Sequence, residues 1–182
     1  MADLQTSRKL LKNKSLNNFM KKPVWTFTNK KTLNEKEFIE YFERKVFKTI
    51  RKYGLLPKDK TFKIKKDKTL NTSVLKSILE KKFLVEYSLN PNTSSENLSD
   101  IAENTFENLI NANFKGISPE DKISRPLYFI SDKELEVYSK LKKINGEKKK
   151  RNKKIQDLFN KFLDKNPDLE INIVKVLNQI KP

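Results

Sequence analysis

Three carboxylates at helical spacing are the chain's best candidates for metal or phosphate chemistry. Glu96, Asp100 and Glu103 follow one another at four- and three-residue steps, which places them on one face of a helix. Oxygen ligands of this kind suit Mg²⁺ together with a bound phosphate. No glycine-rich loop adjoins them to hold that phosphate, so the pattern favours an ordinary solvated helix face, with the Mg²⁺ site as the alternative.

The chain contains neither cysteine nor histidine. A thiolate nucleophile, an imidazole base, a zinc ribbon and an iron–sulfur cluster are therefore excluded within this chain, and we predict no cofactor. The absence of disulfides fits a cytoplasmic protein. No apolar run approaches the ~20 residues of a membrane span, so we predict no membrane partner. The basic first 22 residues leave an organelle transit peptide open.

Positive charge is the chain's strongest compositional feature. Lysine and arginine number 40 against 23 acids, a formal net charge of +17. This excess predicts a polyanionic partner, nucleic acid rather than a lipid surface, with a merely solvated basic surface as the alternative. Arg125 could contact phosphate or pair with a neighbouring acid. The predicted RNA-binding residues lie on one helix, at Arg125 and in a mobile basic run: Lys45, Lys48, Arg51, Lys52, Arg125, Lys148, Lys149, Lys150, Arg151, Lys153 and Lys154.

One long helix is predicted over residues 34–53, where Asn34 and Glu37 form a capping box. Its apolar positions recur at three- and four-residue steps and indicate one buried face that ends with Tyr53. Gly54 is expected to terminate it. Before this helix, residues 21–33 favour a strand or hairpin arm that Trp25 anchors on the core.

The next segments predict a strand–helix–strand unit. Residues 61–65 alternate as a half-exposed strand, residues 67–72 form a polar turn, residues 73–82 have helical period, and residues 83–89 form a second strand. This order is typical of a parallel sheet.

Helices dominate the rest of the chain. Residues 97–110 are helical, residues 126–130 are extended, and Ser131 and Glu134 form a capping box for another helix. Asn166-Pro167 separates two final helices that form a hairpin. The sequence therefore predicts a helix-rich α/β fold with a small parallel sheet, flanking helices and a C-terminal helix hairpin.

Several segments resemble, in order, the tRNA 2-thiolation (two-thiouridine synthetase) family of PP-loop ATP pyrophosphatases. Together these segments cover about two-thirds of the chain. They are residues 38–53, 97–110, 123–127, 132–141 and 157–173. The resemblance implies a reduced PP-loop (adenine nucleotide alpha hydrolase-like) domain. It divides the chain into a tail with a zinc-ribbon remnant (1–33), the degenerate PP-loop-like domain (34–144), and a basic linker with the helix hairpin (145–182).

The family's phosphate loop, Ser-Gly-Gly-Lys-Asp-Ser, lies between a strand and a helix, where bare amides cradle pyrophosphate. At that place this sequence has a degenerate loop: Asp67, Lys68, Thr69, Leu70, Asn71 and Thr72. Both glycines are gone, Asp67 would repel phosphate, and only Thr72 keeps hydroxyl chemistry. The family's cysteines are absent as well. We therefore predict a pseudoenzyme without catalytic residues.

The resemblance implies a non-catalytic, tRNA-binding subunit in wobble-uridine 2-thiolation, paired in a hetero-oligomer with an active paralogue. The first alternative is a stand-alone basic RNA-binding module with no part in thiolation. The second is an enzyme with relocated nucleotide chemistry, and the third is a decaying gene product without function.

Overall fold

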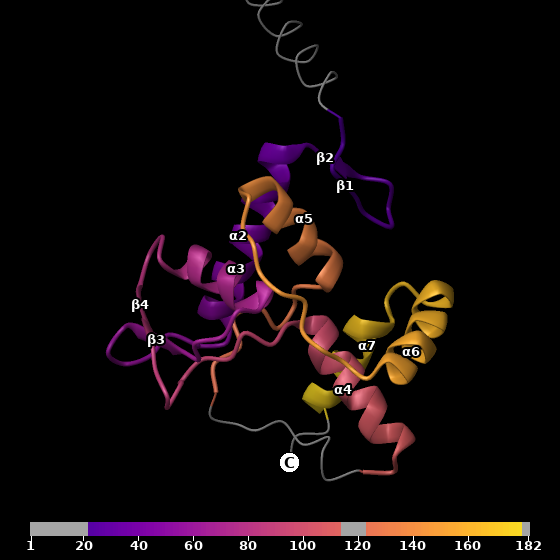
Figure 1. The fold of residues 1–182 in the computed structure, drawn as a ribbon. Helices are drawn as coiled ribbons and strands as arrows, with labels where there is room; N and C mark the ends of the chain where they lie inside the picture. Colours follow the sequence, from indigo (N-terminus) through magenta and orange to yellow (C-terminus); the bar gives the residue numbers. More distant parts are fainter. Residues whose placement is uncertain (1–21, 114–122, 180–182) are drawn as a thin grey trace, which may run out of the picture. The chain divides into compact units, whose positions relative to one another are not determined.

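The computed structural model describes residues 22–113 and 123–179, which divide into two units at Tyr41 and Phe42. In this part of the chain, every helix is too short or too polar to traverse a lipid bilayer. Residues 1–21 of the basic N-terminal tail lie outside the described part of the chain. Figure 1 labels the helices and strands.

The first unit is a small antiparallel hairpin followed by the start of a helix. Strands β1 (Trp25–Thr26) and β2 (Thr32–Leu33) pair Trp25 with Leu33. The ring of Trp25 lies 5.4 Å from that of Phe38, centroid to centroid. The predicted hairpin arm and the anchoring role of its tryptophan are therefore confirmed within this unit.

Helix α2 (Glu35–Lys52) begins directly after the predicted N-cap Asn34 and ends one residue before the predicted last position, Tyr53. The amide of Glu37 donates to Asn34 Oδ1 at 3.1 Å, and the amide of Asn34 donates to Glu37 Oε2 at 3.0 Å. Gly54 adopts a φ of 61°, and the Leu55 amide reaches back to the carbonyl of Ile50 at 2.9 Å. This left-handed C-terminal turn favours glycine because a side chain would strain it.

The second unit contains the predicted parallel strand–helix–strand arrangement. Strands β3 (Thr61–Ile64) and β4 (Leu84–Tyr87) pair in parallel from Thr61 and Leu84 to Ile64 and Tyr87, with α3 (Leu70–Leu79) between them in sequence. Isolated parallel bridges join Ile64 to Thr93 and Thr93 to Ser124. The sheet is small, as predicted: among the described residues of this unit, its ladder consists of β3 and β4.

Helices supply most of the second unit's core. The remaining helices are α4 (Leu98–Ile110), α5 (Asp132–Lys142), α6 (Lys153–Lys165) and α7 (Leu169–Gln179). Helices α6 and α7 form the predicted hairpin and pack on α4, as Figure 1 shows. Their shared apolar cluster is built on Leu98, Ala102, Phe159 and Val174.

The extended segment predicted at residues 126–130 is wrong. Two consecutive turns replace it: the amide of Tyr128 donates to Arg125 O at 3.1 Å and that of Ile130 to Leu127 O at 2.9 Å. In this turned segment both Leu127 and Ile130, three residues apart, are buried. Burial of two large apolar side chains outweighs the weak local preference for a strand.

Candidate functional site

The degenerate loop lies between β3 and α3, as the resemblance predicted, but half of it is helical. Helix α3 begins at Leu70, three residues before the predicted start, so Leu70, Asn71 and Thr72 form its first turn. Thr69 is the N-cap, and its hydroxyl accepts a hydrogen bond from the Thr72 amide at 3.3 Å. The predicted polar turn was therefore too long, because a threonine N-cap starts the helix early.

The loop contains a negative charge of its own, the carboxylate of Asp67, which occupies hydrogen-bond donors of the loop. Its Oδ1 accepts hydrogen bonds from the Thr69 amide at 2.9 Å and from the Thr69 hydroxyl at 2.7 Å. Burial alone would raise the pKa of Asp67, but these hydrogen bonds outweigh it and lower that pKa. An internal carboxylate thus uses donors that a bound phosphate would need.

A second segment closes the loop from outside. We call residues 145–151 the strap. The amide of Leu70 donates to Glu147 O at 2.9 Å, and the amide of Glu147 donates to Lys68 O at 2.8 Å. A Cβ on Gly146 would lie 2.5 Å from Leu70 Cα, so only glycine allows this approach. The backbone of the strap thereby occupies the N-terminal end of α3.

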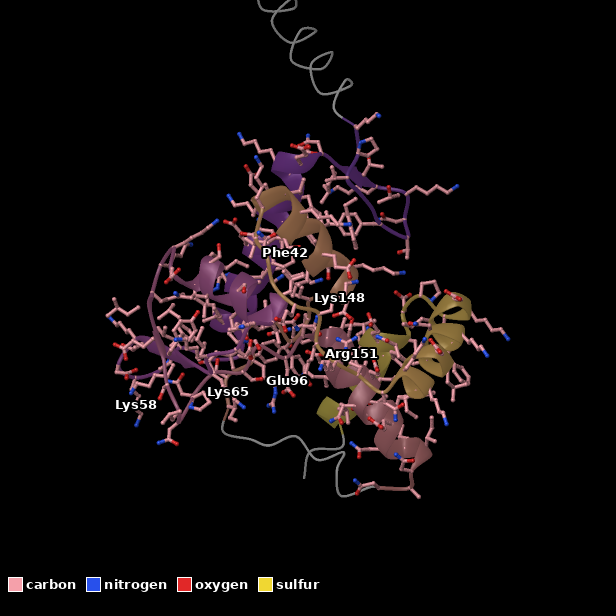
Figure 2. The ribbon with its side chains drawn as sticks, in the orientation of Figure 1. Phe42, Lys58, Lys65, Glu96, Lys148 and Arg151 are labelled. Atoms are coloured by element: carbon pink, nitrogen blue, oxygen red, sulfur yellow. The ribbon has the colours of Figure 1, made fainter. Side chains whose placement is uncertain are left out.

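The strap ends at Arg151, whose guanidinium is held by three carboxylates. Its Nη2 lies 2.6 Å from Asp100 Oδ1, and its Nη1 lies 2.6 Å from Asp132 Oδ2 and 3.2 Å from Glu103 Oε2. The Arg151 side chain is only 13% exposed. Arg151 is labelled in Figure 2. We call these four residues the Arg151 network.

Neighbouring side chains complete the Arg151 network. Asn71 Nδ2 donates to Asp100 Oδ2 at 3.1 Å, and Asn97 Nδ2 donates to Asp132 Oδ1 at 2.7 Å. Asn71 belongs to the degenerate loop, so the loop, the strap and two helix starts share one set of polar contacts. Such full hydrogen bonding is what a buried charge cluster needs.

The pKa values of the Arg151 network reflect its burial. Burial raises the pKa of Glu103, and the charge of Arg151 offsets only part of this rise. For Arg151, burial would lower the pKa, but its hydrogen bond and charge interaction with Asp132, together with Asp100, raise it. Arg151 therefore stays charged in the folded protein.

The predicted solvated face of Glu96, Asp100 and Glu103 is wrong for two of its members. Asp100 and Glu103 are buried at 7% and 6% exposure, facing Arg151. Across residues 22–113 and 123–179, no three Asp or Glu side chains are grouped in a way that could hold a metal ion. Glu96 precedes α4 and accepts from Arg125 Nε at 3.1 Å. Of the two roles considered for Arg125, the structure has the ion pair with an acid.

A small polar cavity adjoins the Arg151 network. Its volume is about 150 Å³, and it lies between the first turn of α3, the start of α5 and the strap. Ligand sites for small molecules usually enclose ~300–1,000 Å³, so this cavity has little room for a nucleotide. Residues of both charges line it: Leu70, Asn71, Asp132, Leu135, Glu136, Lys148, Lys149, Arg151 and Gln156.

The predicted RNA-binding residues fall into two groups. Those with internal acidic partners are Lys45 with Glu134, Arg125 with Glu96, Lys148 with Glu136, Lys149 with Asp100, and Arg151 with its network. The others are exposed and make no ion pair within the described part of the chain: Lys48, Arg51, Lys52, Lys150, Lys153 and Lys154.

A larger groove lies at the C-terminal half of α2, and we call it the α2 groove. Its volume is about 370 Å³. Tyr53, predicted to lie on the buried face of α2, is 47% exposed here, because it follows the last helical residue and turns out of the core. Its position beside Lys52 was the only sequence signal for the groove. The lining residues are Lys45, Lys48, Thr49, Lys52, Tyr53, Leu98, Phe129 and Ile171.

Comparison with known proteins yields a structural match alone. No protein-family model and no curated protein sequence matches the chain. A solved structure of the U34-tRNA thiolase NcsA from Methanococcus maripaludis, with its [4Fe-4S] cluster, is similar at a TM-score of 0.66 and 13% identity. The match covers 84% of this chain and 81% of that one. The fold is PP-loop-like. This confirms the predicted reduced α/β domain.

Proposed function

We propose that this protein is a non-catalytic tRNA-binding subunit that acts beside an active tRNA thiolase. The observation that carries the proposal is the closed phosphate loop. Asp67 and the strap take up donors at the N-terminal end of α3, where a PP-loop enzyme would bind pyrophosphate. With no cysteine or histidine in the sequence, thiol and imidazole chemistry are also missing.

The link to tRNA rests on fold and charge. The similar structure is a U34-tRNA thiolase, and this chain pairs that fold with a net charge of +17. Arg151, Arg125 and Lys45 are engaged with acids, so the proposed phosphate contacts are the six exposed cations without ion pairs. Such contacts give salt-dependent binding with little sequence preference, and a partner enzyme would supply selectivity. The proposed location is the cytoplasm.

Binding of tRNA by the purified chain tests the first part of the proposal. Changing Lys150, Lys153 and Lys154 together to Gln should weaken tRNA binding and reduce the salt slope of log K by about two to three. The matched control changes Lys58, Lys65 and Lys66 to Gln, which removes the same charge from exposed positions beside β3. Figure 2 labels Lys58 and Lys65 and shows Lys58 at the outer edge of the second unit. Equal losses in both triple variants would mean that total charge, not this surface, binds tRNA.

The non-catalytic role has its own test. Incubation with ATP and tRNA should yield no AMP above a blank, since the loop's donors are occupied. Formation of AMP that depends on this chain would end the pseudoenzyme proposal and favour relocated nucleotide chemistry.

Participation in thiolation is tested in cells. Mass spectrometry of tRNA from a deletion strain should show reduced 2-thiouridine, and a thiolase should co-purify with the tagged chain. Normal 2-thiouridine, together with intact tRNA binding in vitro, would favour the stand-alone RNA-binding module.

A further inference from the structure

We propose that the α2 groove binds one unpaired nucleotide of an RNA, with the base against Tyr53 and Phe129 and the adjacent phosphates on Lys48 and Lys52. This inference rests on the proposed RNA-binding function and adds a site and a ligand class to it. The groove lies outside both the degenerate loop and the Arg151 network, which share no residue with it.

The aromatic pair provides the surface for a base. The rings of Tyr53 and Phe129 are 5.5 Å apart between centroids and are inclined by 30°. Tyr53 is 47% exposed although a partner ring is beside it. The left-handed turn at Gly54 holds Tyr53 at the end of α2. Exposed aromatic rings on a rigid support are the usual stacking surface for unpaired bases.

The interior of the groove is apolar. Leu98 at the start of α4 and Ile171 in α7 line it together with Phe129. Its volume of about 370 Å³ falls at the lower end of the ~300–1,000 Å³ typical of small-molecule sites. A planar base has two apolar faces and suits such a lining.

The charge of the groove is of one sign. Three lysines line it, and no acidic residue among those that the structure describes does so. Lys45 is paired with Glu134, but Lys48 and Lys52 are exposed and make no ion pair among residues 22–113 and 123–179. The ammonium of Lys52 also lies 5.2 Å from the centre of the Tyr53 ring. A ligand with a flat apolar body and a negative charge is complementary to both features, and a nucleotide has both.

The same geometry favours unpaired over duplex RNA. Bases inside an A-form helix are stacked on their neighbours and cannot present a face to a protein ring. Only a loop, a bulge or a single strand can place a base in the groove. A duplex would still meet the exposed lysines through its phosphates, with no contribution from the rings.

Fluorescence anisotropy with a labelled oligouridylate and a labelled RNA hairpin of equal phosphate number tests the inference. Tyr53→Leu should weaken oligouridylate binding about tenfold, within the range known for loss of one stacking partner. Phe129→Leu should act in the same direction. Tyr53→Phe keeps the ring and should bind as the parent does. Binding of a fully paired hairpin stem should change less than twofold in all three variants.

Tyr87→Leu is the matched control. Tyr87 is also 47% exposed and also has a lysine over its ring, with Lys76 Nζ 4.8 Å from the centre, but it lies on β4 outside the groove. Its variant should bind oligouridylate as the parent does. Thermal melting of each variant checks that a lost affinity does not come from unfolding.

Three outcomes would overturn the inference. If Tyr53→Leu and Phe129→Leu bind oligouridylate as the parent does, the α2 groove does not bind the nucleotide. The proposed RNA binding would then still stand. Displacement of the oligouridylate by polyglutamate at equal charge concentration would mean that the groove binds any polyanion and does not recognise a base. Failure of the parent to bind tRNA or either RNA would refute the proposed function itself, and the groove with it.

Discussion

Two basic regions of this molecule have opposite surroundings. Arg151 lies in the most basic run of the sequence, yet its side chain is only 13% exposed and pairs with Asp100, Glu103 and Asp132. Lys48 and Lys52 come from a helix whose first half is acidic, yet they remain exposed beside an apolar groove. The difference shows that local charge density does not indicate which cations are available to a partner. A cation is unavailable to a partner when acidic side chains from distant parts of the sequence pair with it in the fold.

The consequences for stability and binding are also opposite. A largely buried cation that pairs with three carboxylates is needed by the fold, because its loss removes most of the positive charge that compensates them. An exposed lysine contributes little to the fold and is available for a phosphate. The following predictions test this contrast, in order of decreasing effect on stability.

The largest effect is expected from Arg151→Met. Glu103 would remain buried without its counter-charge, and Asp100 would keep only Lys149 at 3.4 Å, so the free energy of unfolding should fall by about 3–5 kcal/mol. Urea denaturation followed by circular dichroism measures this loss. Lys150→Met in the same strap is the control and should change stability by no more than about 0.5 kcal/mol. If both changes lowered the free energy of unfolding equally, the largely buried Arg151 would matter no more to the fold than an exposed lysine.

A smaller loss is expected from Gly146→Ala. The added Cβ would lie 2.5 Å from Leu70 Cα, so the strap must move away from the degenerate loop. We expect a loss of about 1–3 kcal/mol, the usual cost of overpacking. Asn145→Ala at the exposed neighbouring position is the control. Faster amide exchange at Leu70 and Glu147 in the Gly146 variant alone would show that the strap has left the loop; unchanged exchange would contradict the closed-loop description.

A pH-dependent effect of smaller size is expected from two carboxylates. Glu103 has a pKa raised above its ordinary value of 4.5, chiefly by burial, with Asp132 and Asp100 adding to the rise and Arg151 opposing it. The folded state therefore holds its proton more tightly, and stability falls as pH rises from about 4.5 through the raised pKa. Glu103→Gln should reduce this fall.

Asp67 should behave in the opposite way. Burial opposes ionisation there, but the hydrogen bonds from Thr69 lower its pKa below the ordinary value of 3.8. The contribution of ionised Asp67 to the free energy of unfolding is present above pH 3.8 and is lost as the pH falls through the lowered pKa. Asp67→Asn should therefore flatten the acid side of the stability profile. Unfolding curves from about pH 3 to pH 7 check both variants, and a change of the same sign in both would be inconsistent with these environments.

The sequence predicted those features whose causes are local. Helix α2 and the start of α5 follow from capping boxes and apolar periodicity, and the parallel strands β3 and β4 follow from short apolar runs around a helix. The strap and the Arg151 network could not be predicted in this way. Arg151 meets Asp100 across 51 positions of sequence, and nothing in either segment indicates the other. An isolated glycine among lysines, Gly146, was the one available signal of a close backbone approach.

The smallest effect on stability, and a clear effect on binding, is expected when Lys48 and Lys52 are both changed to Gln. Neither lysine makes an ion pair in the described residues, so stability should change by less than about 1 kcal/mol. The salt slope for oligouridylate should fall by about 1.4, which is ~0.7 for each lost phosphate contact on a single strand. The matched control is Lys58→Gln with Lys65→Gln, which removes the same charge beside β3. If the groove variant unfolded as readily as Arg151→Met, exposure would not distinguish the two basic regions, since both would then be serving the fold.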